Sequence, residues 1–471
     1  MLPRKNISIW VIPFFLLFLF GSFIRGAWAL TTAEEKKLGK EVLLEMEKKV
    51  EFVRDLSIQT FLDKVGQSLV AQISPTPFEF KFYLINALDP NAFALPGGYI
   101  FITTGLIVLA ESEQELAGVL SHELAHITQR HVAKMIERSK RLNIASMVAM
   151  IAAMLAGGGG AGSQAGMAMA MATGEALALK YTREMEADAD QNSLQYMIKA
   201  GYDPNGLLTF MNKIYKLSLT STLNIPPYLS THPVIEDRIS LMENLLQTGQ
   251  KPVGPYKAFG NYKKIQVKAF VEERDPHIAV NHFQSLVDSD SQNSDAYYGL
   301  GLSYRKMGRL DKALETLQHG YSLAPNDSDI LRELGIVYFF SGKLDQAIKN
   351  LEAVYSTPKA GGGQSDDLLT LYYLGRGYQE RGAFANALPL FLKVQGGHPE
   401  FIDVQHNLGS VYGRMGEKGL SHFYFGKYFK LRGDKKNALL HFRTALDWLD
   451  RGRPEREETQ REIKELAEIK S

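Results

Sequence analysis

The stretch SHELAHITQRH, residues 121–131, decides how the first half of this chain is interpreted. It places His122 and His126 four residues apart, with Glu123 beside the first. On a helix with a period of 3.6 residues, two histidines at this spacing lie one turn apart on the same face. The H-E-x-x-H pattern is typical of a helix whose histidines bind zinc and whose glutamate acts as general base.

The pattern alone is weak, because it should occur by chance in about one or two of every hundred chains of this length. A catalytic zinc takes three protein ligands and leaves one position for water, so a third ligand is needed. We predict that Glu184, in YTREMEADAD, is that ligand. Asp188 lies one turn later on the same face and is predicted to accept the outer N–H of a ligand histidine. Glu186 ranks lower because it points away from the Asp188 direction.

Three further residues with basic side chains lie near these motifs. His131 lies five residues past His126, so we expect it to point away from the metal and to be structural or to support a ligand. Arg183 and Arg238 either pair with acidic groups of the site or are solvated at the surface.

The composition limits the classes of function. A chain of 471 residues has room for two or three domains, each with its own core. The net charge is +1, with 22% charged residues, so no strong electrostatic field favours nucleic acid. The chain contains no cysteine, which excludes disulfides and a thioether-linked lipid anchor.

The N-terminus has the three parts of a secretory signal peptide. A basic start is followed by an apolar run from Ile7 to Ile24 and by Ala27-Trp28-Ala29, an A-x-A exit. We predict cleavage after Ala29; the alternative is an uncleaved membrane anchor. Export without disulfide or lipid suits a soluble periplasmic protein of a Gram-negative bacterium.

A small sheet is expected beside the metal-binding helix. Residues 31–72 have helical periodicity, FEFKFYLIN alternates as a strand does, and NAFALPGGYIFIT contains a Pro-Gly-Gly turn between two apolar stretches. We predict that Asn91, Ala92, Phe93 and Gly98 line an exposed strand edge that receives substrate backbone. The alternative is an ordinary core hairpin.

The segment 144–179 is rich in Ala, Met and Gly, and its apolar part is too short to cross a bilayer. We interpret it as a buried helix followed by a flexible loop. The alternative is a Met-rich surface that contacts unfolded clients or a membrane peripherally.

The second half of the chain is a repeat. Leu300-Gly301, Tyr304, Gly308 and Ala313 recur 34 residues later. The set returns once more after a short AGGGQ insertion, and then again as Leu408-Gly409, Tyr412 and Gly416. This pattern resembles the tetratricopeptide repeat, two antiparallel helices per unit that stack into a solenoid with an extended binding surface.

HELAH, EMEAD, NAFALPGG and STHP, with the N-terminal signal and the repeats, together resemble the M48 family of zinc metallopeptidases, and within it the periplasmic beta-barrel assembly-enhancing proteases. The resemblance implies one Zn²⁺ per chain held by His122, His126 and Glu184, with Glu123 as general base. It also places the loop of His232 at the cleft, where this side chain either steadies the oxyanion or occupies the open position of zinc and silences the enzyme.

We therefore expect a mainly α chain in which a zincin-like α+β metallopeptidase domain with a small sheet precedes an α-solenoid of tetratricopeptide repeats. The expected parts are a signal peptide (1–29), a peptidase domain (30–250), a repeat domain (260–450) and a charged C-terminal helix (451–471). The predicted function is periplasmic endopeptidase cleavage of unfolded polypeptides, with outer-membrane beta-barrel precursors and the barrel-assembly machinery as partners by resemblance. The alternative is a chaperone-like assembly factor with a latched or structural zinc site.

Overall fold

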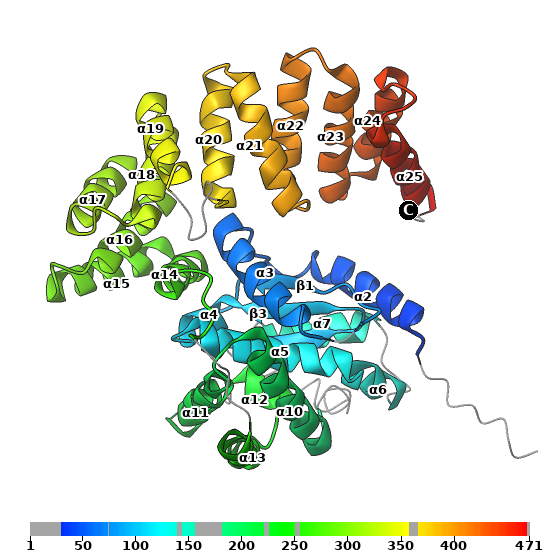
Figure 1. The fold of residues 1–471 in the computed structure, drawn as a ribbon, viewed down its shortest axis with the longest axis vertical. Coiled ribbons are helices and arrows are strands. Elements are labelled where there is room, and N and C mark those ends of the chain that lie inside the picture. The colour runs from blue at the N-terminus through cyan, green and yellow to red at the C-terminus, as the bar shows by residue number, and fades with distance from the viewer. Residues whose placement is uncertain are drawn as a thin grey trace, which may run out of the picture.

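The structure is a computed structural model, and two halves of the chain are distinct in it: a mixed domain below and an arc of paired helices above (Figure 1). It describes residues 30–73, 75–138, 144–155, 181–220, 226–249, 255–357 and 366–468. The predicted signal peptide and the Gly-rich part of segment 144–179 lie outside these residues.

The sheet of the first half has three strands in the order β1-β3-β2. β1 (Lys81–Ile85) runs parallel to β3 (Tyr99–Thr103), and β2 (Ala92–Leu95) pairs with β3 in the antiparallel direction. The predicted hairpin is confirmed, since Gly97 and Gly98 have φ of 86° and 107° in the turn between β2 and β3, where residues with side chains are disfavoured.

Helices cover both faces of this sheet. One core joins α5 to β1, β2, α3 and the helices after residue 181, and a second core packs α2 and α7 against the opposite face. The expected buried helix at the start of segment 144–179 is confirmed as α7, because Met147, Val148 and Ile151 are at most 3% exposed. The helices of this half that the structure describes are α2 (Thr32–Met46), α3 (Leu56–Val70), α4 (Thr104–Leu109), α5 (Glu113–Thr128), α6 (His131–Arg138), α7 (Ile144–Leu155), α10 (Arg183–Ala200), α11 (Asn205–Thr220), α12 (Pro227–Thr231) and α13 (Ile235–Thr248).

The second half is the predicted solenoid of antiparallel helix pairs. Small residues permit the close approach within each pair: a Cβ added to Gly301 would lie 2.5 Å from Leu317 Cγ, and one added to Gly335 would lie 2.7 Å from Leu351 Cγ. The described helices are α14 (Tyr262–Glu273), α15 (Pro276–Ser289), α16 (Ser294–Lys306), α17 (Leu310–Leu323), α18 (Ser328–Phe340), α19 (Leu344–Tyr355), α20 (Leu368–Glu380), α21 (Phe384–Gly397), α22 (Ile402–Arg414), α23 (Lys418–Leu431), α24 (Lys435–Trp448) and α25 (Pro454–Glu468).

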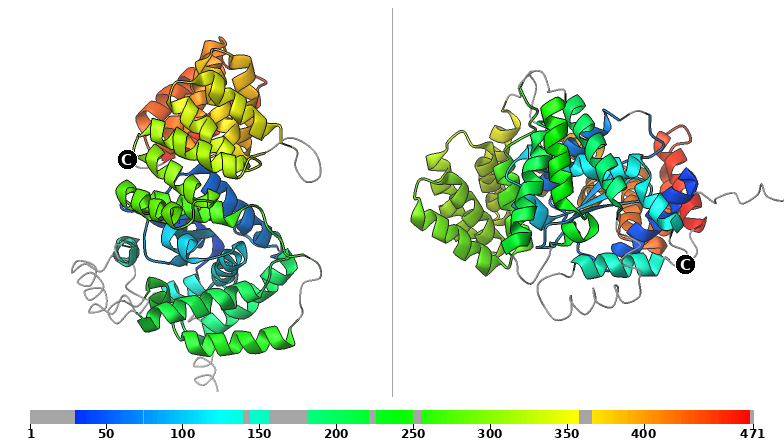
Figure 2. Two further views of the ribbon diagram at one scale, coloured as in Figure 1. Left: turned by 90° about the vertical axis from the view of Figure 1, so that its left-hand side faces the viewer. Right: turned by 90° about the horizontal axis from the view of Figure 1, so that it is seen from below.

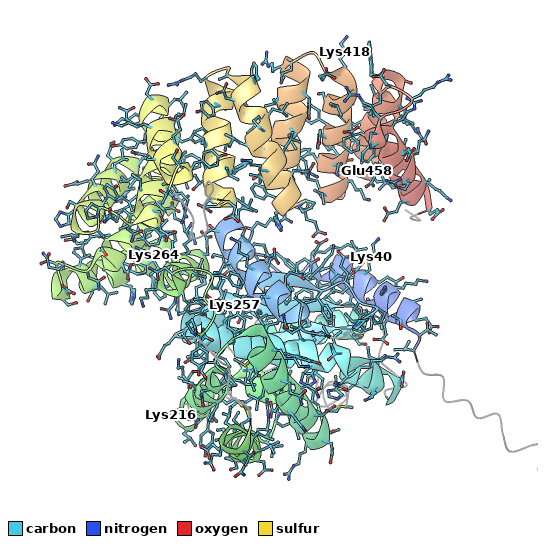
Figure 3. The ribbon with its side chains drawn as sticks, in the orientation of Figure 1. Lys40, Lys216, Lys257, Lys264, Lys418 and Glu458 are labelled. Carbon is cyan, nitrogen blue, oxygen red and sulfur yellow. The ribbon has the colours of Figure 1, made fainter. Side chains whose placement is uncertain are left out.

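The arc bends over the peptidase-like half and touches it at several points (Figures 1 and 2). α14 packs on α4, and α20 packs on α3. Within the arc itself, Lys264 of α14, labelled in Figure 3, is 2% exposed and lies 2.8 Å from Asp295 Oδ1 of α16 and 2.8 Å from Oδ2 of Asp327, the N-cap of α18. At the other end of the arc, Lys40 of α2 lies 3.2 Å from Glu465.

The predicted fold class is therefore confirmed, a mainly helical chain with one small sheet followed by helical repeats. Within the part of the chain that the structure describes, no helix has both the length and the apolar composition needed to cross a bilayer.

Candidate metal centre

The helix α5 carries the H-E-x-x-H residues through the middle of the domain. It begins after Ser112, whose side chain accepts a hydrogen bond from the Glu115 amide, as an N-cap residue does. Its apolar residues face the core, and His122, Glu123 and His126 are fully buried as well. Polar groups this deep need partners, so the surroundings of these three side chains define the site.

The helix α10 supplies the carboxylate. Thr182 caps its N-terminus by accepting from the Met185 amide, and Glu186 lies in its first turn. Glu186 is fully buried, with Oε2 3.5 Å from His122 Nε2 and Oε1 3.4 Å from His126 Nε2. The carboxylate therefore faces both imidazoles.

Four side chains converge on one point: His122, His126, Glu186 and His232, whose ligand atoms all lie within 4.8 Å of one another. The two Nε2 atoms of His122 and His126 are 3.0 Å apart, and His232 Nδ1 lies 3.1 Å from Glu186 Oε1. With metal–ligand bonds of about 2.0–2.2 Å, a tetrahedral site needs neighbouring ligand atoms roughly 3.3 Å apart. The measured separations of 3.0 to 3.5 Å fit that requirement, and imidazole with carboxylate is a donor set that suits zinc.

Asp190 and Arg238 support the ligands from behind. Asp190 Oδ1 lies 3.0 Å from His122 Nδ1, the ring nitrogen that faces away from the convergence point. Arg238 donates from Nε and Nη2 to the two oxygens of Asp190 at 2.9 and 2.7 Å, and its Nη1 lies 2.5 Å from Glu186 Oε2. Such outer contacts fix the orientation and tautomer of metal-binding side chains.

The contact with Arg238 lowers the pKa of both carboxyl groups, Glu186 and Asp190. Burial alone would raise the pKa of Glu186, but Arg238 and then His232 outweigh it and hold that pKa well below its usual range. The pKa of Asp190 is likewise lowered, because Arg238 outweighs the effect of burial. The lowered pKa of each carboxyl group favours its ionised form.

Glu123 has a different environment. Neither of its carboxylate oxygens has a hydrogen-bond partner among the described residues, although both are buried. Burial raises its pKa above the ordinary value, and His232 opposes that shift. A carboxyl group with a raised pKa beside a metal position is suited to proton transfer near neutral pH.

His232 closes the site. It is fully buried, with Nε2 3.4 Å from Glu123 Oε1. Its ring stacks between Tyr228 and Tyr181, whose centroids lie 4.5 and 5.1 Å away, and Tyr181 also stacks on His126 at 3.6 Å. In this conformation the predicted cleft histidine lies inside the cluster, between the general-base candidate and the acidic ligand.

The prediction for the acidic residues chose the wrong pair. Glu184 is exposed, and Asp188 contacts neither of the two clustered histidines of α5. Glu186 stands in the predicted place of Glu184, and Asp190 in that of Asp188. Both pairs have a spacing of four residues, so the spacing could not distinguish them.

Asp188 is nevertheless connected to the cluster through His131, which contacts His126. His131 Nδ1 lies 3.1 Å from His126 Nδ1, and His131 Nε2 lies 3.2 Å from Asp188 Oδ2. His131 therefore supports His126 from behind, as Asp190 supports His122. Arg183, by contrast, is exposed and lies 3.4 Å from Asp237 at the surface.

The strand predicted to bind substrate is the edge strand beside the site, but its residues differ in role. The Thr103 amide donates to the Asn91 carbonyl, so the backbone N–H and C=O groups of Asn91 point toward β3. Those of Phe93, two residues later, do the same. By alternation, the backbone groups of Ala92 face the free edge. Gly98 is misassigned, because it lies in the turn on the β1 side, where an added Cβ would lie 2.2 Å from Glu79 O.

Two residues of this predicted edge, Ala94 and Asn91, have further features in the structure. Ala94 shares the outward register of Ala92, and α5 packs against the strand that carries both. The side-chain amide of Asn91 is buried, and neither its oxygen nor its nitrogen has a hydrogen-bond partner among the described residues.

A helix with H-E-x-x-H, a facing glutamate and an adjacent edge strand define a metallopeptidase-type domain, joined here to a helical-repeat domain. Residues 56–246 match the family model of peptidase family M48, and residues 266–328 match that of the tetratricopeptide repeat. The chain therefore contains a peptidase M48 domain, and tetratricopeptide repeats follow it.

Curated relatives carry related names. The chain is 29% identical over 292 residues to the putative beta-barrel assembly-enhancing protease of Vibrio cholerae, covering 60% of this chain and 59% of the relative. It is 26% identical over 216 residues to the beta-barrel assembly-enhancing protease of Escherichia coli, covering 46% and 44%. It is 28% identical over 190 residues to the mitochondrial metalloendopeptidase OMA1 of Schizosaccharomyces pombe, covering 40% and 53%. The chain spans less than two thirds of the length of each.

Proposed function

We propose that this protein is a metal-dependent endopeptidase that holds one zinc ion with His122, His126 and Glu186. The observation that carries the proposal is the convergence of two imidazole nitrogens and an ionised carboxylate at tetrahedral ligand spacing, with Glu123 beside them. A site with a purely structural metal would not need Glu123, whose two oxygens make no hydrogen bond among the described residues.

Zinc, when bound at such a site, lowers the pKa of its water to about 7 and polarises the substrate carbonyl. The chain's own part is proton transfer. Glu123 accepts a proton from the water whose oxygen attacks the carbonyl carbon, and it passes that proton to the nitrogen that leaves as the peptide C–N bond breaks. Asp190 and Arg238 keep His122 and Glu186 in place during these steps.

Substrate is proposed to bind as an added strand at the free edge of β2. The backbone groups of Ala92 and Ala94 face that edge, and within the described ranges no other segment forms a backbone hydrogen bond with either. An added strand is recognised mainly through its main chain, so many sequences bind but only extended ones. Folded proteins are thereby spared.

His232 is proposed to be the resting latch of the site. It is the fourth member of the cluster, and a tetrahedral metal with four protein ligands has no position for water. Turnover then requires that the loop of His232 moves away from Glu123 and Glu186. In that open state His232 is proposed to donate a hydrogen bond to the oxyanion.

We propose a periplasmic location and unfolded outer-membrane beta-barrel precursors as clients, with the repeat domain docking to the barrel-assembly machinery. The N-terminal signal pattern and the names of the two bacterial relatives support this assignment. Stacked helical repeats build extended surfaces for protein partners, which supports a docking role for the arc.

The test is cleavage of an unfolded beta-barrel precursor by the chain from Leu30 to Ser471, with and without chelator. We expect cleavage that is lost in Glu123→Gln and with chelator, while Glu123→Gln still binds one zinc. Glu186→Gln should lose zinc, whereas Glu184→Gln should retain both zinc and activity, because only Glu186 faces the histidines. Zinc loss in Glu184→Gln would contradict the assignment.

The buried position of His232 favours a second candidate, a chaperone-like assembly factor whose site stays latched. His232→Ala separates the two. If the enzyme is latched at rest, His232→Ala cleaves faster than wild type. If the protein binds clients equally well in wild type, Glu123→Gln and His232→Ala and cleaves with none of them, the chaperone function stands instead.

A further inference from the structure

The first residue after the predicted signal cleavage site is held in a specific contact. The backbone nitrogen of Leu30 donates a hydrogen bond to Glu137 Oε1 at 2.7 Å. Its carbonyl oxygen accepts from the guanidinium group of Arg130. Thr31 follows directly as the N-cap of α2 and forms a capping box with Glu34, so contacts hold both Leu30 and Thr31 in place.

The corner between α5 and α6 receives this residue. Arg130 forms the corner and has φ of 56°, which is uncommon for a residue with a side chain. Its Nε donates at 2.8 Å to Oε1 of Glu35, which is 2% exposed in the first turn of α2. The next residue, His131, lies 3.1 Å from His126 of the metal cluster. The start of α2 is therefore attached to the segment that lies behind a metal-ligand candidate.

The charges at this corner do not balance in the uncleaved chain. Glu34, Glu35 and Glu137 are acidic, and Arg130 is the cation that contacts one of them. Among the described residues, Glu137 forms no ion pair with a lysine, arginine or histidine side chain; its partner is the Leu30 nitrogen. Glu137 is also near enough to Glu35 to raise the pKa of that carboxyl group, alongside the larger effect of burial. A positive charge at Leu30 would give Glu137 a cationic partner.

We propose that signal-peptide cleavage after Ala29 supplies that charge, so that the α-ammonium group of Leu30 pairs with Glu137 and fixes α2 onto the corner beside the metal site. Hydrolysis adds water across the Ala29–Leu30 peptide bond. Ala29 leaves with a new carboxylate, and Leu30 keeps the nitrogen, which is largely protonated at neutral pH because its reference pKa is about 7.7–8.0. A neutral amide donor thus becomes a cation with three N–H groups.

Three acidic side chains around Leu30 make a positive charge at its nitrogen favourable. A positive charge at a helix N-terminus is normally unfavourable, because the first-turn N–H groups already carry partial positive charge. Here Glu34 and Glu35 of the first turn and Glu137 of α6 offset that repulsion. A charge-assisted hydrogen bond is about twice as strong as a neutral one, and an uncleaved or extended chain cannot form it at this place.

The pairing is tested with four proteins in a double-mutant cycle. Each ends at Ser471 and begins either at Leu30 or with one extra glycine before Leu30, and each carries either Glu137 or Glu137→Gln. All carry Glu123→Gln, so that self-digestion cannot change their ends. The contact is exposed, so the free Leu30 chain should melt about 1–3 °C above the extended chain. This difference should vanish with Glu137→Gln. It should persist with Glu41→Gln, a control in α2 that forms no ion pair with another described residue.

An equal difference with Glu137 and with Glu137→Gln, or no difference at all, would overturn the pairing. A second measurement addresses the premise: the N-terminal residue of the protein exported from cells, read by mass spectrometry. Leu30 is expected, and any other first residue would overturn the proposal. Neither readout depends on peptidase activity, so failure here is distinguishable from failure of the proposed enzyme.

Discussion

Arg238→Ala should destabilise the metal-free protein strongly. Arg238 is 3% exposed and contacts two fully buried carboxyl groups, Glu186 and Asp190. Removing the guanidinium leaves both charges in a buried environment without their cation. Such a loss differs from the loss of a surface ion pair, because the remaining charges cannot be solvated by water.

The magnitude follows from this burial. Breaking a buried pair by removing one partner costs about 3–5 kcal/mol. For a domain of about 150–250 residues, each kcal/mol corresponds to about 2–4 °C in melting temperature, so a decrease of roughly 6–20 °C is expected. Zinc should reduce the deficit, because a bound cation replaces part of the charge that Arg238 supplied to Glu186.

Thermal unfolding by circular dichroism, with chelator and with one equivalent of zinc, measures both effects. Arg183→Ala is the matched control, since Arg183 pairs with Asp237 at 3.4 Å with side chains 74% and 67% exposed. It should change the melting temperature by no more than about 2 °C. If Arg238→Ala melts within 2 °C of wild type in chelator, Arg238 is not the cation that compensates these carboxylates.

Three other perturbations examine the surroundings of the site. His131→Phe should weaken zinc binding about 10- to 100-fold in competition with a chelator, because His126 loses the contact at its outer nitrogen; unchanged affinity would remove that role. Gly118→Ala should cost about 1–3 kcal/mol in urea unfolding, since its Cβ would lie 2.7 Å from the Leu207 backbone and push α11 from α5; full stability would contradict that close approach. Asp63→Asn should stabilise the protein at pH 8 but not at pH 4. Burial, and then Glu400, raises the pKa of Asp63 from 3.8 to about 6, so the folded state loses stability as pH rises from 4 to 6. Because the Asp63 side chain is 34% exposed, Asp63→Asn should gain about 1 kcal/mol of stability at pH 8. Equal melting temperatures of both proteins at pH 8 would exclude this effect.

Local patterns in the sequence were enough for much of this fold. The H-E-x-x-H helix, the Pro-Gly-Gly hairpin and the repeats each depend on contacts within about forty residues, which periodicity and turn residues report directly. The glycines at 308, 342, 382 and 416 all have positive φ at the turn between the helices of a pair, as the repeat pattern implies. The parallel pairing of β1 with β3 depends on distant packing and was not predicted.

The choice of Glu184 over Glu186 could have been avoided. At about 100° per residue, the apolar positions Met185, Ala189 and Met197 spread over roughly 120° of α10. Glu186 falls within that arc, whereas Glu184 lies on the opposite side. The apolar stripe, rather than the spacing of the acids, tells which carboxylate is buried. The contacts of Arg238 with Glu186, Asp190 and His122 join residues at least 48 positions apart in the sequence, which no local pattern reports.

The two edges of the sheet explain why an extended client would bind near the metal and not elsewhere. On the β1 edge, successive outward carbonyls are already occupied: Gln67 donates to Phe80 O at 3.0 Å, and Gln59 donates to Phe82 O at 2.7 Å. The Val53 amide donates to the Leu84 carbonyl at 2.9 Å, which closes the rest of that edge. A client strand therefore has no acceptor row there, because α3 and the segment before it cover the edge. β2 is the remaining edge and packs against α5, so pairing with it brings a client's backbone toward the helix of Glu123.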